Sequence, residues 1–137
     1  MKVLVMYTSR FAWTPQVKNV ETVETVSDGA VVHDCMVAFI QVEAEDEEKD
    51  LLSREKKLVN HLKWTLRKNE SQRMVLHSFA HLSESKASLE FTRQVFEKAE
   101  ERLGKAGIET FQTPFGYFLD LDIQAPGFSL ARIWKSL

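Results

Sequence analysis

Apolar and β-branched residues dominate the first third of the chain, in runs that are typical of β-strands. Residues 2–8 predict a strand buried on both faces, and residues 30–42, apolar along most of their length, predict a central strand. Between them we expect a loop over residues 9–15 and an extended segment over residues 17–26. Residues 27–29, Ser-Asp-Gly, are a turn signal between two β-prone runs, so residues 17–26 and 30–42 are expected to form a hairpin.

The middle of the chain changes to the spacing of amphipathic helices. The acidic run 43–50 is expected to be a solvated loop in which Asp46 caps the following helix. Apolar residues then recur at helical spacing as far as Lys68. A second helix is expected to begin near Ser85 and to end at Gly104. Its apolar face consists of Phe91, Val95, Phe96, Ala99 and Leu103.

Short strands follow each predicted helix. Residues 73–77 and 108–111 are strand candidates, and residues 117–123 alternate between apolar and polar side chains as a half-buried strand does. Residues 129–136 are expected to form a short terminal helix. The order of elements predicts a single α/β domain over residues 1–137, in which two long helices pack on a mixed β-sheet.

Composition refines this picture mainly by exclusion. The longest apolar runs are far shorter than the ~20 residues of a membrane-spanning helix, so no membrane partner is expected. The single cysteine, Cys35, excludes an intramolecular disulfide and fits a reducing, cytoplasmic compartment. The net charge of −2 provides no overall attraction to nucleic acid. Any contact with RNA must therefore be local.

Residues 77–83 carry the candidate chemistry. They join a predicted strand to a predicted helix, and such turns lie at the sheet edge where open α/β folds bind ligands. They place His77, Ser78 and His81 near backbone N–H groups, a combination that hydrolytic reactions use. A second turn, 114–117, is expected to form the opposite wall of the same site. A structural role explains His81 equally well.

Other chemistries are less favoured. His77 and His81 have the spacing of a helical zinc pair, but Ser78 stands where a metalloprotease motif has glutamate and no third ligand is nearby. No metal or cofactor is therefore expected. Cys35 and His33 would share one strand face, yet a small buried cysteine is the commoner situation. The basic end of the first helix fits a solvated face better than a contact with the RNA backbone.

Four segments resemble a known family, the N-terminal editing domain of archaeal threonyl-tRNA synthetases. They are residues 1–4, 37–43, 79–83 (Phe-Ala-His-Leu-Ser) and 113–117 (Thr-Pro-Phe-Gly-Tyr). The resemblance implies a fold similar to D-aminoacyl-tRNA deacylases, a homodimer, and hydrolysis of serine wrongly attached to threonine tRNA. The implied partners are the aminoacylated 3′ end of that tRNA and the rest of a synthetase.

The resemblance also implies a pocket that admits serine and excludes threonine, lined by Val42, Ser78, Phe79, Ala80, His81, Phe115, Gly116 and Tyr117. Within it, the positions nearest the chemistry would be Ala80, His81, Phe115 and Gly116. Three further substrate-facing positions depart from the family. Phe118 and Leu119 stand where many members have Tyr-Lys, and Arg132 stands where they have glutamate. The expected hydrolysis therefore relies on backbone N–H groups and on the 2′-hydroxyl of the terminal adenosine.

Two other functions remain open. One is a D-aminoacyl-tRNA deacylase, which a comparison of D-aminoacyl and L-seryl substrates would distinguish. The other is a non-catalytic module for binding the tRNA end or for dimerisation, which Phe118, Leu119 and Arg132 suggest. Binding of a seryl-adenosine analogue without turnover would indicate that module.

Overall fold

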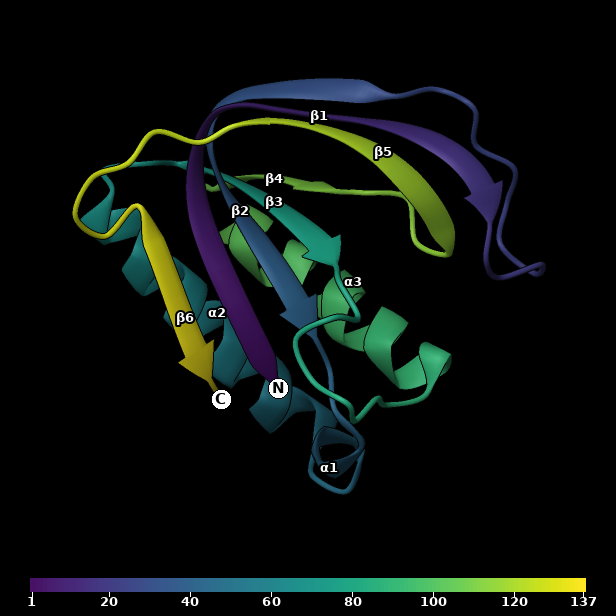
Figure 1. The fold of residues 1–137 in the computed structure, drawn as a ribbon. Helices are drawn as coiled ribbons and strands as arrows, with labels where there is room; N and C mark the ends of the chain where they lie inside the picture. The colour runs from purple at the N-terminus through teal and green to yellow at the C-terminus, as the bar shows by residue number, and fades with distance from the viewer.

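A six-stranded mixed sheet forms the centre of the computed structural model, which describes residues 1–137 (Figure 1). The strands are β1 (Lys2–Lys18), β2 (Ala30–Gln41), β3 (Arg73–Ser78), β4 (Glu109–Gln112), β5 (Tyr117–Gln124) and β6 (Arg132–Ser136). Their order is β4-β3-β2-β1-β5, and β6 also pairs with β1. Strands β2, β3 and β4 are parallel, whereas β1 runs antiparallel to β2, β5 and β6. The carboxyl ends of β2 and β3 therefore meet at one edge of the sheet.

Strands β1 and β2 form an antiparallel pair, but the predicted hairpin of residues 17–26 with residues 30–42 and the predicted loop at residues 9–15 are both wrong. Phe11 and Trp13 are buried, and the ladder continues past them to the pair Trp13 and Ala30. Their alternate, inward-facing positions are those of a strand rather than a loop. Strand β1 ends at Lys18, so the predicted extended segment 17–26 belongs mostly to the connection between the strands. The two strands curl over together in Figure 1.

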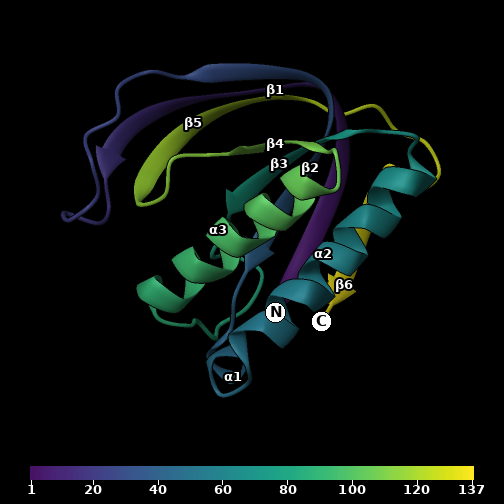
Figure 2. The ribbon, with the colours of Figure 1, turned by 180° about the vertical axis from the view of Figure 1, so that it is seen from behind.

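Two long helices, α2 (Leu51–Lys68) and α3 (Leu89–Lys105), cover one face of the sheet (Figure 2). The cap of α2 is Asp50, whose side chain accepts from the backbone N–H of Ser53, so the prediction that Asp46 caps it is wrong. Helix α3 begins later than the expected residue 85 because Ser88 caps it, accepting from the N–H of Phe91. Its predicted apolar face is confirmed, and all five of those residues are buried.

Apolar side chains fill both faces of the curled sheet. The larger core lies between the sheet and the helices and includes Val3, Val5, Leu62 and Phe96. A smaller core, with Phe11 and Trp13, lies inside the curl. The start of β1 is covered on both faces, as predicted: Val3 and Val5 are buried in the larger core, while Leu4 and Met6 are half-buried against the smaller one. The α/β fold with two long helices on a mixed sheet is confirmed.

The last segment is a strand and not the predicted terminal helix. Strand β6 pairs with residues 2–6 of β1, where Ile133 lies opposite Val5. The free edge of β1 supplies backbone partners that a short isolated helix would lack. The N–H of Leu137 donates to the carbonyl of Met1 at 2.8 Å, so the two marked chain ends lie side by side in Figure 1.

Candidate functional site

A small cavity lies where the ends of β2 and β3 meet the loop 79–88 and the beginning of α3. Its volume is about 80 Å³. Four predicted residues line it together: Val42, Ser78, Ala80 and Phe115. The turns at 77–83 and 114–117 therefore lie on the same cavity, as expected. Its other lining residues are Ile40, Gln41, Lys86, Ala87, Leu89 and Thr92.

Gln41 holds the loop that forms one wall of this cavity. Its amide nitrogen donates to the carbonyls of Ser83 at 2.7 Å and Ser85 at 2.8 Å. Its amide oxygen accepts from the N–H groups of Leu82 at 2.6 Å and Ser83 at 2.7 Å. Gln41 is only 3 % exposed, whereas its partners in the loop are half-buried. Because a buried amide is costly to leave unpaired, Gln41 fixes the loop in one conformation.

The turns at residues 77–83 and 114–117 contain backbone N–H donors that have no acceptor in the protein. The N–H of Phe79 donates to the carbonyl of Ile40 at 3.0 Å. The N–H groups of Ala80, His81, Phe115 and Gly116 donate to no protein atom. Unpaired N–H groups beside a small cavity are the donors from which an oxyanion hole is built.

Gly116 gives the second turn its shape. Its φ of 83° lies in the left-handed region, which favours glycine. A Cβ at this position would lie 2.9 Å from Cγ1 of Val23, and the carbonyl of Gly116 accepts from the N–H of Asn19 at 2.9 Å. The connection between β1 and β2 therefore packs directly against this turn and supports Phe115 from behind.

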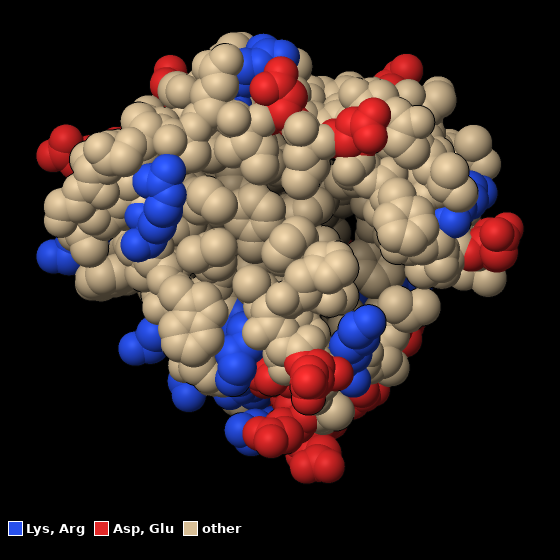
Figure 3. Space-filling model, viewed as in Figure 1, with Lys and Arg blue, Asp and Glu red and all other residues tan.

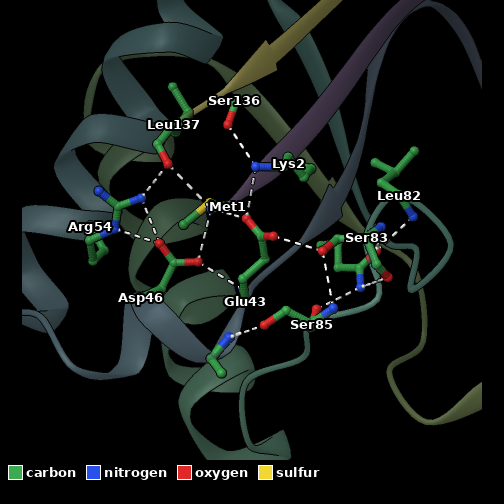
Figure 4. A network of polar contacts seen from close by, with 12 residues as sticks. Met1, Lys2, Glu43, Asp46, Arg54, Leu82, Ser83, Ser85, Ser136 and Leu137 are labelled. Atoms are coloured by element: carbon green, nitrogen blue, oxygen red, sulfur yellow. Dashed lines mark hydrogen bonds and ion pairs between the residues drawn. The ribbon is translucent and has the colours of Figure 1, made fainter.

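The acidic run forms a clamp on the loop 79–88, which corrects the expectation of a solvated loop. It contains a short helix, α1 (Ala44–Glu47). Glu43 accepts from the amino group of Met1 and from the hydroxyl of Ser83, both at 2.7 Å (Figure 4). Asp46 is 1 % exposed and pairs with Arg54 at 2.6 Å. The half-buried carboxylate of Glu43 and the buried one of Asp46 thus tie the amino terminus, α2 and the loop into one network.

We expect Glu43→Gln to destabilise the fold by roughly 2–3 kcal/mol near neutral pH, because it removes one partner of a buried ion pair while Asp46 still neutralises the amino group. Burial alone would raise the pKa of Glu43, but hydrogen bonds from the amino terminus and Ser83 lower it to about 2. A carboxyl with a lowered folded pKa stabilises the fold above its unfolded pKa, and this contribution disappears as the pH falls towards the folded value.

Urea unfolding of the wild type and of Glu43→Gln should therefore differ most above about pH 5 and converge as the pH falls from about 4.5 towards 2. A difference that stays constant over that range would show that the ionised carboxylate is not the stabilising group.

His77 supports the site from the interior without lining the cavity. Its Nδ1 lies 2.9 Å from the hydroxyl of Thr113, and burial lowers its pKa to about 4, so the ring is neutral near pH 7. The ring packs against Phe39 and Phe79, with centroids 5.3 and 5.9 Å away. Phe79 in turn contacts His81, which is exposed. These rings form a continuous series of contacts from the core to the loop 79–88. No group of three or more His, Cys, Asp or Glu side chains is arranged to hold a metal.

Several predicted residues lie outside the cavity. The hydroxyl of Tyr117 donates to the carbonyl of Glu24 and accepts from the N–H of Val26, both at 2.7 Å, which ties it to the loop between β1 and β2. Phe118 is 62 % exposed on β5. Leu119 packs against the core inside the curl. Phe79, His81, Gly116 and Arg132 are also absent from the lining.

Two other candidates from the sequence have surroundings that fit a structural rather than a catalytic role. They are Arg132 and the pair of Cys35 and His33. The guanidinium of Arg132 donates to the carbonyls of Pro126 and Ala125, both at 3.0 Å, and so closes the turn before β6. Cys35 is buried, its sulfur lies 3.2 Å from the hydroxyl of Thr8, and burial raises the pKa of its thiol. His33 is exposed. The arrangement of Cys35 and His33 is not that of a nucleophile and its base.

Lys86 is one of six residues of the cavity that the sequence analysis did not predict. It is the one charged side chain in the lining, and it forms no ion pair or hydrogen bond with the rest of the protein. A lysine in a polar loop gives no signal of its own. Gln41, a polar residue at the end of an apolar strand, is the signal that could have drawn attention to that loop.

Comparison with known proteins identifies the family. Residues 1–137 match the family described as the archaea-specific editing domain of threonyl-tRNA synthetase. The threonine–tRNA ligase of Methanobrevibacter smithii is 28% identical over 117 residues, 85% of this chain and 19% of that protein. The ligase of Methanococcus aeolicus is 24% identical over 140 residues, 100% of this chain and 22% of that protein. The chain thus spans about a fifth of the length of these relatives.

Solved structures add a likeness of fold alone. The structure titled c-Myc DNA Unwinding Element Binding Protein has a TM-score of 0.68 and 13% sequence identity, and the match covers 100% of this chain and 99% of that one. The chain therefore belongs to the family of archaea-specific editing domains of threonyl-tRNA synthetase.

Proposed function

We propose that the chain is a proofreading hydrolase that removes serine mischarged on threonine tRNA. Membership of the editing-domain family supports an aminoacyl-tRNA deacylase. The observation that carries the proposal is a cavity of about 80 Å³ lined by Ala80 and Phe115, from two turns that contain four unpaired backbone donors. A synthetic site built for threonine cannot strongly reject serine, because one missing methyl changes binding by only ~1–3 kcal/mol. A second site that admits serine and excludes the larger threonine would supply the missing discrimination.

The size and lining of the cavity favour serine. Larger hollows of about 410 and 560 Å³ lie elsewhere on the surface, but they would not separate serine from threonine by one methyl group. The small cavity offers the hydroxyl of Ser78 for a polar contact, while Val42, Ala80 and Phe115 limit its width. A threonine methyl would have to displace one of these apolar groups, and overpacking typically costs ~1–3 kcal/mol.

The proposed chemistry uses donors and the substrate rather than a side-chain base. The positions expected to carry Tyr, Lys and Glu hold Phe118, Leu119 and Arg132, and none of these takes a proton from water near neutral pH. Backbone N–H groups of the two turns would stabilise the oxyanion, and the 2′-hydroxyl of the terminal adenosine would hold the attacking water. The ammonium group of Lys86, which has no partner, would pair with a phosphate near the 3′ end.

His81→Ala is expected to slow serine release less than tenfold. The imidazole is exposed beside Phe79 and would orient the substrate, whereas a general base typically contributes roughly 10²–10⁴-fold. The measurement is single-turnover hydrolysis of seryl-tRNA from about pH 5.5 to 7.5, where histidines usually titrate. The wild-type rate should show no histidine-like step. Such a step, abolished in His81→Ala, would make His81 the base.

The proposed partners follow from the family. They are the aminoacylated 3′ end of threonine tRNA, a second copy of the chain in a homodimer, and the rest of a threonyl-tRNA synthetase, in the cytoplasm. Exposed apolar side chains on β5 and β6, such as Phe118 and Trp134, fit a contact between copies. None of the helices has the length and apolar character needed to cross a membrane.

The experiment that separates this proposal from its alternatives compares L-seryl-tRNA with D-seryl-tRNA. Faster release of L-serine supports proofreading, and faster release of D-serine indicates a D-aminoacyl-tRNA deacylase. If a non-hydrolysable seryl-adenosine analogue binds but neither ester is cleaved, the chain is a tRNA-end-binding module.

A further inference from the structure

The outer face of α2 carries positive charge that nothing in the protein neutralises. Its five outward cations are exposed or half-exposed, and none forms an ion pair or hydrogen bond: Lys56, Lys57, Lys63, Arg67 and Lys68. The one carboxylate of the helix, Glu55, is buried and pairs with Arg102 of α3 at 2.6 Å. Because the helix has no exposed carboxylate, these cations repel one another in the free protein.

On the neighbouring helix, α3, exposed cations such as Arg93 do have carboxylate partners. On α3, Arg93 pairs with Glu90 at 2.6 Å and Lys105 pairs with Glu101 at 2.8 Å. The whole chain has a net charge of −2, so the positive charge is concentrated rather than spread. In Figure 3 the charged side chains along the lower left rim, where Figure 1 shows α2 and β6, are blue.

Aromatic rings lie among these cations. Trp64 is 37 % exposed, its indole lies nearly parallel to His61, and Nζ of Lys68 is 5.8 Å from its ring centroid. Strand β6 adds Lys135, whose register opposite Val3 turns it to the helix side of the sheet. Asn69, just beyond α2, donates to the carbonyl of Leu130, which joins the helix to the segment before β6. Cations interleaved with exposed aromatic rings fit an RNA strand, since phosphates pair with the cations and bases stack on the rings.

We propose that this α2–β6 surface, formed by the five α2 cations, Trp64 and Lys135, binds the sugar–phosphate backbone of the tRNA whose 3′ end enters the cavity. The proposal rests on the proposed function. The α2 cations extend over about 18 Å at the rise of an α-helix, which is enough for several phosphates. Helix α2 follows directly on the acidic clamp, whose Glu43 accepts from Ser83 of the loop 79–88, and the proposal places the α2 cations and the cavity on one RNA. Glu70, just beyond α2, is exposed and lines a hollow together with Lys63 and Arg67, but the five cations outnumber it. A polyanion therefore fits this face better than a second copy of this chain, whose net charge is only −2.

The test is the salt dependence of tRNA binding. The probe is an uncharged threonine tRNA transcript, and its affinity is measured by fluorescence anisotropy from about 50 to 200 mM salt. The triple variant Lys57→Gln, Lys63→Gln, Lys68→Gln should lower the slope of log K against log salt by about 2–3, and weaken binding at least ~10-fold at the lowest salt. The matched control is Arg93→Gln, Lys98→Gln, Lys105→Gln on α3, which removes the same charge and should leave the slope close to wild type.

The outcomes separate this surface from the function of the cavity. Hydrolysis of a seryl ester of adenosine, too small to reach α2, measures the cavity alone and should be equal in both variants. A slope that is unchanged in the α2 variant, or lowered equally in both variants, would overturn the proposal even if the small ester is cleaved. So would a failure of the wild type to bind the transcript. A change of oligomeric state without a change of slope would assign the face to a contact between copies and would also overturn it.

Discussion

Seryl-tRNA that ends in 2′-deoxyadenosine is expected to bind the chain normally and to be hydrolysed at least ~100-fold more slowly than the natural substrate, the lower end of what a proton-handling group contributes. The cavity has no acidic or imidazole side chain in its lining, and its one charged group is Lys86. The ribose 2′-hydroxyl lies next to an ester on the 3′ oxygen, so it can hold the attacking water in line. Its removal leaves the donors of Ala80, His81, Phe115 and Gly116 in place.

The measurement is single-turnover release of serine from the two substrates, with binding of each followed separately by anisotropy. His81→Ala serves as the matched control, because it changes the one imidazole of the predicted pocket. If the deoxy substrate reacts at the normal rate while His81→Ala is inactive, the histidine is the base and substrate assistance is excluded.

Ala80→Val should also reduce the release of serine at least ~100-fold, about 3 kcal/mol in barrier height. Ala80 lines the cavity and is exposed, so two added methyl groups can occupy the space of about 80 Å³ without disturbing the core. Ala80→Gly should have the opposite effect on selectivity, because it widens the cavity towards the size of threonine. The position therefore tests whether discrimination is steric.

Serine and threonine release are to be measured for wild type, Ala80→Val and Ala80→Gly, with thermal unfolding as a check of the fold. The control is Ala106→Val, an exposed alanine at the end of α3 away from the cavity. Full activity of a folded Ala80→Val protein would remove Ala80 from the site, and equal losses in Ala80→Val and Ala106→Val would point to a general effect on the fold.

The parts of the fold that were predicted from sequence are those with strong local signals. Both long helices follow from a clear apolar period, β2 follows from its apolar run, and β5 follows from its alternation of apolar and polar residues. The segment 9–15 was misassigned because Pro15 and the polar residues around Phe11 and Trp13 are typical of a loop. Its partner strands, β2 and β5, are separated from it in the chain, so only tertiary pairing makes it a strand.

The same reason explains the error at β6. Residues 132–136 pair with residues 2–6, at the other end of the chain. Nothing local distinguishes a short apolar strand of this kind from a short helix. The acidic run was misassigned for a related reason, since Asp46 is buried by Arg54 and by the amino group of Met1.

The candidate site also contains residues that sequence signals identify and residues whose role depends on tertiary contacts. Val42, Ser78, Ala80 and Phe115 belong to turns that the order of strands and the family motifs bring together, and they meet at one cavity. Gln41 acts through hydrogen bonds to residues more than forty positions away. The positions of these partners depend on the conformation of the loop 79–88, which hydrophobic periodicity in the sequence does not predict. Lys86 lines the cavity only because the loop is held in that conformation.

The most direct measurement of the central claim is the release of amino acid from seryl-tRNA and threonyl-tRNA, both made with threonine tRNA and incubated with the purified chain. We predict rapid release of serine and a rate for threonine at least ~10-fold lower, as expected when one methyl group must be accommodated. Equal release of both amino acids, or binding of both tRNAs without release of either, would contradict the account.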